Sequence, residues 1–241
     1  FTCHTAGDIK YLLRLLGMSR AQIDNEVASI QPELEENRRR AEFEKATIFI
    51  GQDPFKAKMV LPEELLGVYD WCPTSLTEKG FMPELLQDME VGFDRALQRV
   101  TYPIRDMYGN LAGIAGGRTM DTQQPKYLVY QGGRREQGTN RWIPGDFGPL
   151  FDEEFPGFQC ENHDYIWNYH RVFTRALEAV SEEDSTVYLV EGYKACLWML
   201  QHGYHNTVAL MGSYISDKQQ LMLHRLGGTV VLMLDNDEAG R

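Results

Sequence analysis

Two apolar segments in the last third of the chain end abruptly in carboxylates, and this feature constrains the fold most. The first, Val187–Val190, leads directly into Glu191 and Gly192, and the second ends at Leu234 immediately before Asp235. Apolar runs bounded in this way are typical of strands buried on both faces of a parallel sheet. Such strands deliver acidic side chains to the open edge of the sheet, where ligands of α/β proteins bind.

The segment between these two strands alternates regularly between helical and strand patterns. The patterns predict helices at residues 194–202 and 218–226 and strands at residues 207–210 and 229–234. Glycines follow both predicted helices, as expected at helix ends. The resulting β-α-β-α-β order predicts parallel strands joined by right-handed crossovers.

Three carboxylates follow the first and last of these strands: Glu191, Asp235 and Asp237. Because side chains alternate along a strand, Asp235 and Asp237 should point to the same side. Carboxylate oxygens suit Mg²⁺, and bound divalent ions neutralise the charge that develops in phosphoryl transfer. Acids at strand ends also cap helices. The residues alone therefore leave open whether this edge binds metal, and whether Glu191 acts as a base instead.

The composition is that of an acidic chain large enough for a substantial core. The chain has 241 residues, 43% of them hydrophobic, and a formal net charge of −11. This charge argues against strong non-specific DNA binding by the whole surface, but leaves a local basic track open. No stretch is long and apolar enough to cross a membrane. The four cysteines are widely scattered, which favours a reducing cytoplasm over a disulfide framework.

The chain before the predicted strand at Val187–Val190 has the pattern of a mixed α and β region. The predicted elements are helices at residues 62–68, 74–79 and 83–89, a β-hairpin at 99–104 and 111–114, a long irregular insertion at 131–164 and a helix at 163–180. The aromatic residues Tyr165, Trp167 and Tyr169 favour packing over a base-stacking platform.

Five motifs occur in order between residues 99 and 241. They are RVTYPIRD at residues 99–106, GNLAGIAGGR at 109–118, PKYL at 125–128, VEGY at 190–193 and DNDEAGR at 235–241. In this order they resemble motifs of the bacterial and phage DNA primases of the DnaG type. The resemblance implies an α/β fold in which an N-terminal α+β subdomain precedes a Toprim domain with a parallel sheet.

The resemblance also implies how the chain is divided. Residues 1–45 would be a zinc-ribbon remnant and helical linker, residues 46–184 the N-terminal subdomain of the catalytic core, and residues 185–241 a Toprim domain truncated at its C-terminal end. Cys3 would be the last ligand of the ribbon. Because zinc needs about four ligands, we expect Zn²⁺ in the full-length protein only.

The implied activity is DNA-directed synthesis of short RNA primers at replication forks, by metal-dependent nucleotidyl transfer on a single-stranded template. The matching catalytic and metal-binding residues are Glu191, Asp235 and Asp237, with Mg²⁺ or Mn²⁺ as cofactor. The matching phosphate-binding residues are Arg105, Arg118 and Lys126, each of which is otherwise an ordinary surface charge. The implied partners are ribonucleoside triphosphates and a replicative helicase. The resemblance implies no membrane association and a location in the cytoplasm of a bacterium or a phage-infected host.

Gly116 and Gly117 precede Arg118 and predict a tight bend that presents its guanidinium to phosphate.

Two features depart from the family pattern. Lys194 and Ala195 stand where the family often has an acid in the second position, so one peripheral carboxylate is missing. The insertion at residues 131–164 is longer than expected for cellular primases, which favours a phage or divergent member. The missing acid favours a degenerate, non-catalytic nucleic-acid-binding homologue as an alternative. Another Toprim enzyme, a topoisomerase or a nuclease, is a further alternative, against which the motifs at residues 99–128 argue.

Overall fold

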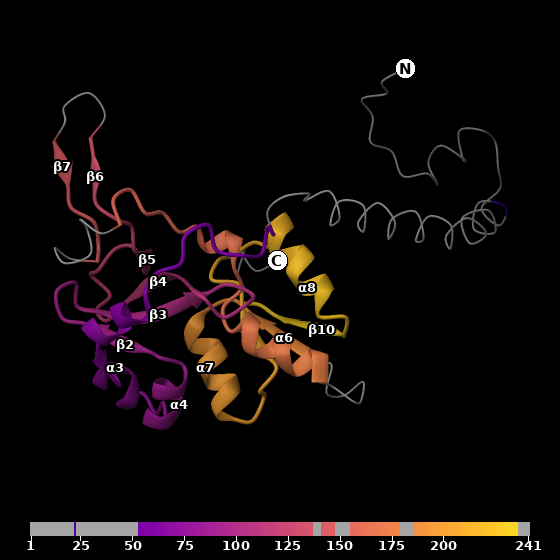
Figure 1. Ribbon diagram of the computed structural model, residues 1–241. Helices are drawn as coiled ribbons and strands as arrows, with labels where there is room; N and C mark the ends of the chain where they lie inside the picture. Colours follow the sequence, from indigo (N-terminus) through magenta and orange to yellow (C-terminus); the bar gives the residue numbers. More distant parts are fainter. Residues whose placement is uncertain (1–21, 23–52, 137–140, 148–154, 179–185, 236–241) are drawn as a thin grey trace, which may run out of the picture. The chain divides into compact units, whose positions relative to one another are not determined.

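The computed structural model describes residues 22, 53–136, 141–147, 155–178 and 186–235 (Figure 1). Apart from Gln22, these residues belong to one compact unit, Asp53–Arg241. The predicted zinc ligand Cys3 and the predicted metal ligand Asp237 lie outside the described residues. No described helix is both long enough and apolar enough to span a membrane.

A five-stranded antiparallel sheet forms the first half of this unit. Its strands are β1 (Asp70–Trp71), β2 (Gly92–Asp94), β3 (Arg99–Arg105), β4 (Leu111–Arg118) and β5 (Tyr127–Val129), in that spatial order. The predicted hairpin is β3–β4, and its turn is held by the carboxylate of Asp106, which accepts hydrogen bonds from the backbone N–H groups of Tyr108 and Asn110. The hairpin prediction is confirmed.

The predicted bend before Arg118 is wrong. Gly116 and Gly117 lie inside β4, which continues in extended form to Arg118. A Cβ atom on Gly116 would lie 2.6 Å from the ring of Tyr130, and one on Gly117 would lie 2.9 Å from the ring of Tyr102. The glycines are therefore needed because aromatic rings pack directly on the strand.

Three short helical segments precede β3, as the sequence predicted. They are η1 (Glu63–Val68), α3 (Thr74–Thr77) and α4 (Pro83–Asp88). The first is a 3₁₀-helix, and the third residue after α3 is Gly80, with φ of +89°. Pro83 occupies the first helical position of α4, where its missing N–H costs nothing.

A three-stranded parallel sheet forms the second half, as predicted. Its strands are β8 (Val187–Val190), β9 (Thr207–Ala209) and β10 (Val230–Met233), with β8 in the centre. The crossovers contain α7 (Tyr193–Gln201) and α8 (Asp217–Arg225). Gly203 follows α7 with φ of +88°, and Ser216 begins α8 with a capping box formed with Gln219.

The segment between the two sheets differs from the prediction in two ways. It contains a small hairpin that was not predicted, and its helix begins later than predicted. It contains a small hairpin of β6 (Arg134–Arg135) and β7 (Trp142–Ile143), then η2 (Asn162–Asp164) and α6 (Tyr169–Glu178). The helix predicted from residue 163 begins only at Tyr169. The reason is tertiary: Trp167 pairs with Ala209 as an isolated bridge, and Asn168, with φ of +65°, donates a side-chain hydrogen bond to the carbonyl of Thr207.

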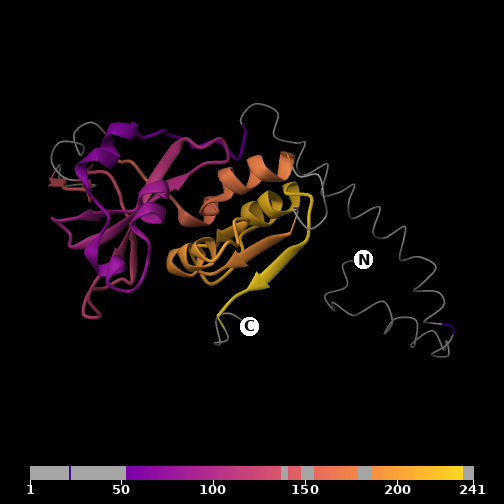
Figure 2. The ribbon, with the colours of Figure 1, turned by 90° about the horizontal axis from the view of Figure 1, so that it is seen from below.

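The two sheets lie next to one another in the ribbon (Figure 2), and a cluster of aromatic side chains connects them. The ring of Tyr193 in α7 stacks on Tyr102 of β3 at 4.4 Å between centroids and contacts Tyr127 of β5 at 5.2 Å. Trp167 packs edge-on against both Tyr102 and Tyr193, and donates its indole N–H to the carbonyl of Pro103. This cluster fixes β4 and β5 beside the N-terminal end of α7, which matters for the site described next. Tyr165, Trp167 and Tyr169 are all buried, which confirms the packing prediction.

Candidate functional site at the carboxyl edge of the parallel sheet

Two of the three predicted carboxylates follow neighbouring parallel strands. The register pairs Val190 of β8 with Met233 of β10, so both strands end at the same level. Glu191 follows Val190 directly, and Asp235 follows Met233 by two residues. The fold therefore brings these two acids to the same edge of the sheet, which is where α/β proteins bind ligands.

The side chain of Glu191 has an unusual environment. Its Oε2 atom is buried and has no hydrogen-bond partner. Its backbone is fixed, because its carbonyl accepts a hydrogen bond from the N–H of Met211 at 3.0 Å. A buried carboxylate oxygen without a partner is costly. A divalent cation would satisfy it, so the donor chemistry at Glu191 fits a metal ion.

Asp235 is exposed and also carries oxygen ligands suited to Mg²⁺. Among the described residues, no group of three or more His, Cys, Asp or Glu side chains is placed to hold a metal ion. The metal set of Glu191, Asp235 and Asp237 stays a prediction.

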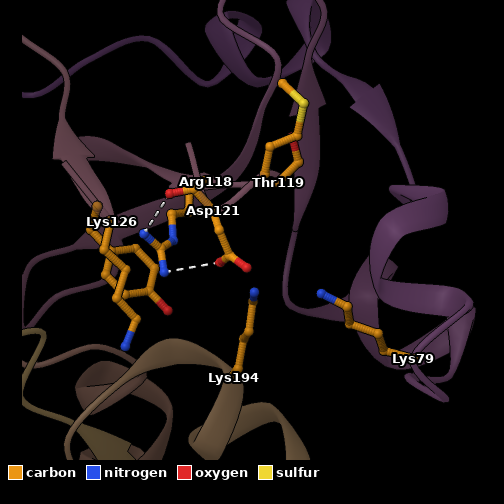
Figure 3. A pocket seen from close by; sticks show the side chains of 8 residues that line it. Lys79, Arg118, Thr119, Asp121, Lys126 and Lys194 are labelled. Atoms are coloured by element: carbon orange, nitrogen blue, oxygen red, sulfur yellow. Dashed lines mark hydrogen bonds and ion pairs between the residues drawn. The ribbon is translucent and has the colours of Figure 1, made fainter. Parts of the chain in front are cut away.

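The predicted phosphate-binding residues Arg118 and Lys126 are brought together. The backbone N–H of Arg118 donates to the carbonyl of Lys126 at 2.9 Å, across the start of the β4–β5 pairing. Their side chains line one hollow of about 140 Å³, here called the basic pocket (Figure 3). The lining residues are Lys79, Arg118, Thr119, Met120, Asp121, Lys126, Tyr127 and Lys194.

Arg99 holds the loop that carries these two cations. Its side chain is buried, and its guanidinium donates to the carbonyls of Gly116, Gln124 and Pro125 at 3.0–3.2 Å. Three carbonyls from both ends of the loop thus share one donor group. Arg99 is a positioning residue for Arg118 and Lys126 that the sequence did not single out.

Arg118 forms an ion pair inside the basic pocket. Its guanidinium lies 3.1 Å from the carboxylate of Asp121 and also donates to the Asp121 carbonyl at 3.2 Å. The Asp121 side chain is 99% exposed. An ion pair with a partner so exposed to solvent contributes little to stability.

Lys79 and Lys194 complete the basic pocket, and sequence reasoning missed both. Lys79 lies just after α3, and Lys194 is the second residue of α7. Figure 3 shows their side chains pointing toward one another, with the Asp121 carboxylate beside Lys194. Burial lowers the pKa of Lys194, and the charges of Lys79, Lys126 and Arg118 lower it further. Gln201 of α7 donates a hydrogen bond to the carbonyl of Gly80 and accepts one from the N–H of Met82, which places Lys79 near α7. These contacts join residues about 120 positions apart, so no local pattern could have revealed the pocket.

Arg105 is not part of this arrangement. Its guanidinium forms two-point ion pairs with Glu63 and Glu90 at 2.7–2.8 Å and donates to the carbonyl of Gly109. Burial disfavours the cation, but the hydrogen bonds to the two carboxylates outweigh this and raise the pKa of Arg105. With all its charge matched locally, Arg105 braces the β3–β4 turn and does not line the basic pocket.

The comparisons with known proteins agree with this fold. Residues 185–241 match the model of the Toprim domain. The chain is 30% identical over 166 residues to a DNA primase of Deinococcus radiodurans, covering 68% of this chain and 24% of that protein. It is 26% identical over 163 residues to a DNA primase of Clostridium acetobutylicum, covering 65% and 21%. The chain therefore spans roughly a quarter or less of the length of these relatives.

Two solved structures share the fold at low sequence identity. The zinc-binding and RNA polymerase domains of the Aquifex aeolicus primase give a TM-score of 0.52 at 17% identity, over 74% of this chain and 47% of that one. A DnaG primase catalytic domain bound to single-stranded DNA gives 0.51 at 18% identity, over 74% and 61%. Residues 185–241 thus match the Toprim domain, and over the part that aligns the chain is a relative of DNA primases.

Proposed function

We propose that the protein synthesises RNA primers on single-stranded DNA at replication forks, by nucleotidyl transfer. The observation that carries this proposal is the unpartnered, buried carboxylate oxygen of Glu191 at the carboxyl edge of the parallel sheet, three residues before Lys194 of the basic pocket. The related proteins are DNA primases, and one structure of similar fold holds single-stranded DNA. The substrates would be ribonucleoside triphosphates and the template a DNA single strand.

In this reaction a 3′-hydroxyl attacks the α-phosphate of a nucleotide, the bond to the β-phosphate breaks, and pyrophosphate leaves. Glu191, Asp235 and Asp237 would hold Mg²⁺ or Mn²⁺, which neutralises the charge that develops on the phosphate oxygens. Arg118 and Lys126 would bind phosphates of the template or the nucleotide. Arg99 would keep both cations in place through its three carbonyl contacts.

The remaining parts of the proposal follow from the family. Residues 1–45 would be linker and zinc-ribbon remnant, residues 46–184 the N-terminal subdomain, and residues 185–241 the Toprim domain. Cys3 would be a ligand of Zn²⁺. A replicative helicase would be the partner, in the cytoplasm of a bacterium or a phage-infected host.

The test is primer synthesis by the natural protein that contains these residues, with Glu191→Gln. This substitution removes the charge but hardly changes the volume, so we expect a loss of at least ~100-fold in primer yield without loss of folding. The control is Glu161→Gln, which removes an exposed carboxylate outside the site. Primer yield from Glu191→Gln equal to that of the control would refute the assignment.

One observation favours a second candidate, a non-catalytic nucleic-acid-binding homologue. Ala195 stands where the family often has an acid, and the preceding residue, Lys194, adds a cation to the basic pocket. In that case the unaltered protein would bind single-stranded DNA but make no primers at any concentration of Mg²⁺ or Mn²⁺. The same assay therefore separates the two candidates before any substitution is made.

A further inference from the structure

The segment that follows β9 lies at the carboxyl edge of the parallel sheet, next to Glu191. β9 pairs with β8 in parallel, with Ala209 opposite Val190. One step further along, the N–H of Met211 donates to the carbonyl of Glu191 at 3.0 Å. Residues 211–216 then connect this edge to the start of α8. The connecting segment is therefore on the side of the sheet where ligands of α/β proteins bind.

Contacts with η2 hold this segment in place. The side-chain amide of Asn162 donates to the carbonyl of Met211 at 2.8 Å. The hydroxyl of Ser216 donates to the carbonyl of His163 at 2.6 Å. Between these two points the imidazole of His163 lies close to Gly212, where an added Cβ atom would be 3.3 Å from the ring. The backbone of the segment is thus held near both ends and at its middle.

Tyr214 is the aromatic side chain that this segment presents to solvent. Its ring stacks on the imidazole of His163, with 4.4 Å between the ring centroids and 28° between the planes. Tyr214 is 56% exposed, and among the described residues its hydroxyl group forms no hydrogen bond. Neither burial in the core nor a polar contact therefore explains its position. An exposed ring that is supported on one face offers a surface on which a further planar group can stack.

A nucleobase is the planar group that fits this surface and this place. The cations of the basic pocket suit phosphates, and contacts to phosphates fix the position of a nucleic acid without contacting its bases. Aromatic side chains supply the complementary contact, because every base has a face that stacks on them regardless of sequence. A site that joins nucleotides at the edge marked by Glu191 has to hold bases as well as phosphates.

We propose that Tyr214, supported by His163, stacks on a nucleobase at the carboxyl edge of the parallel sheet. The base belongs to the template strand or to a bound nucleoside triphosphate, and the stacking chemistry is the same for both. His163 is a positioning residue, because it acts through the ring of Tyr214. The inference rests on the proposed function for the identity of the ligand, while its test needs neither a metal ion nor primer synthesis.

The experiment measures binding to the chain, residues 1–241, at low salt and in the presence of EDTA. Fluorescence anisotropy follows a labelled single-stranded oligonucleotide, and calorimetry follows ATP. We expect Tyr214→Leu to weaken the binding of at least one of these ligands by at least ~5-fold, because leucine is apolar but has no aromatic face. Tyr214→Phe keeps that face and should bind as the unaltered chain does.

Three controls separate stacking from other effects. Tyr108→Leu removes a tyrosine of the β3–β4 turn that is also 56% exposed, and should leave both affinities unchanged. An abasic strand keeps its phosphates but has no bases, so it should bind equally to Tyr214→Leu and to the unaltered chain. The melting temperature of Tyr214→Leu should stay close to that of the unaltered chain, because the substituted side chain is exposed.

The two ligands identify the source of the base. Weaker binding of the oligonucleotide alone assigns the stacked base to the template, weaker binding of ATP alone assigns it to the nucleotide, and weaker binding of both indicates one surface used by each. All three results support the proposal.

Four results would overturn it. The first is unaltered affinity for both ligands in Tyr214→Leu, and the second is no binding of either ligand by the unaltered chain. The third is equal weakening in Tyr214→Phe and Tyr214→Leu, which would assign the effect to the hydroxyl group. The fourth is equal weakening for the abasic strand, which would assign it to the backbone of the nucleic acid. Because no metal is present, these outcomes are independent of whether Glu191→Gln abolishes primer synthesis.

Discussion

Glu191 and Lys194 lie on either side of the N-cap residue of α7, and each has a charge that its surroundings within the fold do not satisfy. The carboxylate of Glu191 has a buried oxygen without a partner, and the ammonium of Lys194 is half-buried among other cations. The unpartnered oxygen of Glu191 is the group that we propose to bind a metal ion. By contrast, Arg105 is paired with two carboxylates and is complete without any ligand.

His170 makes the stability of the fold depend on pH. Burial lowers the pKa of His170 to about 4, with smaller contributions from Arg171, Arg105 and Arg175, and Asp106 acts in the opposite direction. In the unfolded chain the pKa is about 6.5. Between these values the unfolded state binds more protons, so the free energy of unfolding falls as the pH is lowered from about 6.5 to about 4. Above pH 6.5 this contribution to stability is fully present.

We therefore expect His170→Gln to flatten the pH dependence of stability in this window. The difference between the protein and the variant should reach on the order of 3 kcal/mol near pH 4. Chemical denaturation at several pH values, with His224→Gln as the exposed control, measures it. The same slope in His170→Gln as in the unaltered chain would show that His170 is protonated normally in the folded state.

At the level of elements, the sequence predicts the fold best where the spacing of apolar residues and the glycines that end helices agree. The order β8-α7-β9-α8-β10 is predictable because apolar runs alternate with helical spacing, and because Gly203 and Gly227 end the helices with positive φ. The start of α6 was not predictable. Its first predicted turn is taken by the bridge between Trp167 and Ala209, residues 42 positions apart, and local spacing does not encode such a contact.

The bend predicted at the glycines of β4 is wrong for a related reason. A Gly-Gly pair before a cation predicts a bend, yet both residues are extended and make room for rings from β3, β5 and the residue after it. Local sequence contains no information about those rings. Gly117→Ala should therefore destabilise the chain by about 1–3 kcal/mol, through overpacking against Tyr102 and Tyr127.

Gly67→Ala is the matched control for that prediction, because an added Cβ at Gly67 meets nothing within 4 Å. It should leave the free energy of unfolding unchanged within about 0.5 kcal/mol or raise it slightly. Chemical denaturation of both variants measures the difference. Equal stability of the two would mean that the rings move aside at no cost and that the close packing does not require glycine.

At the level of the whole molecule, the candidate site is a product of the fold. The carboxylates could be placed at one sheet edge from the sequence, because parallel strands end together. The basic pocket could not, because its four cations come from segments separated by up to 115 residues, from Lys79 to Lys194. The net charge of −11 disfavours non-specific binding of polyanions by the surface as a whole, so the gathering of four cations in one pocket is a marked local departure.

The central claim is that Glu191 at this edge holds a divalent cation, and Mn²⁺ binding measured by electron paramagnetic resonance tests it most directly. The natural protein that contains these residues would be titrated beside its Glu191→Gln, Asp235→Asn and Glu161→Gln variants. We predict that the first two substitutions weaken Mn²⁺ binding by at least ~10-fold, because each removes a charged oxygen ligand, while the Glu161 control binds as the unaltered protein does. Equal Mn²⁺ affinity in all four proteins would contradict the account.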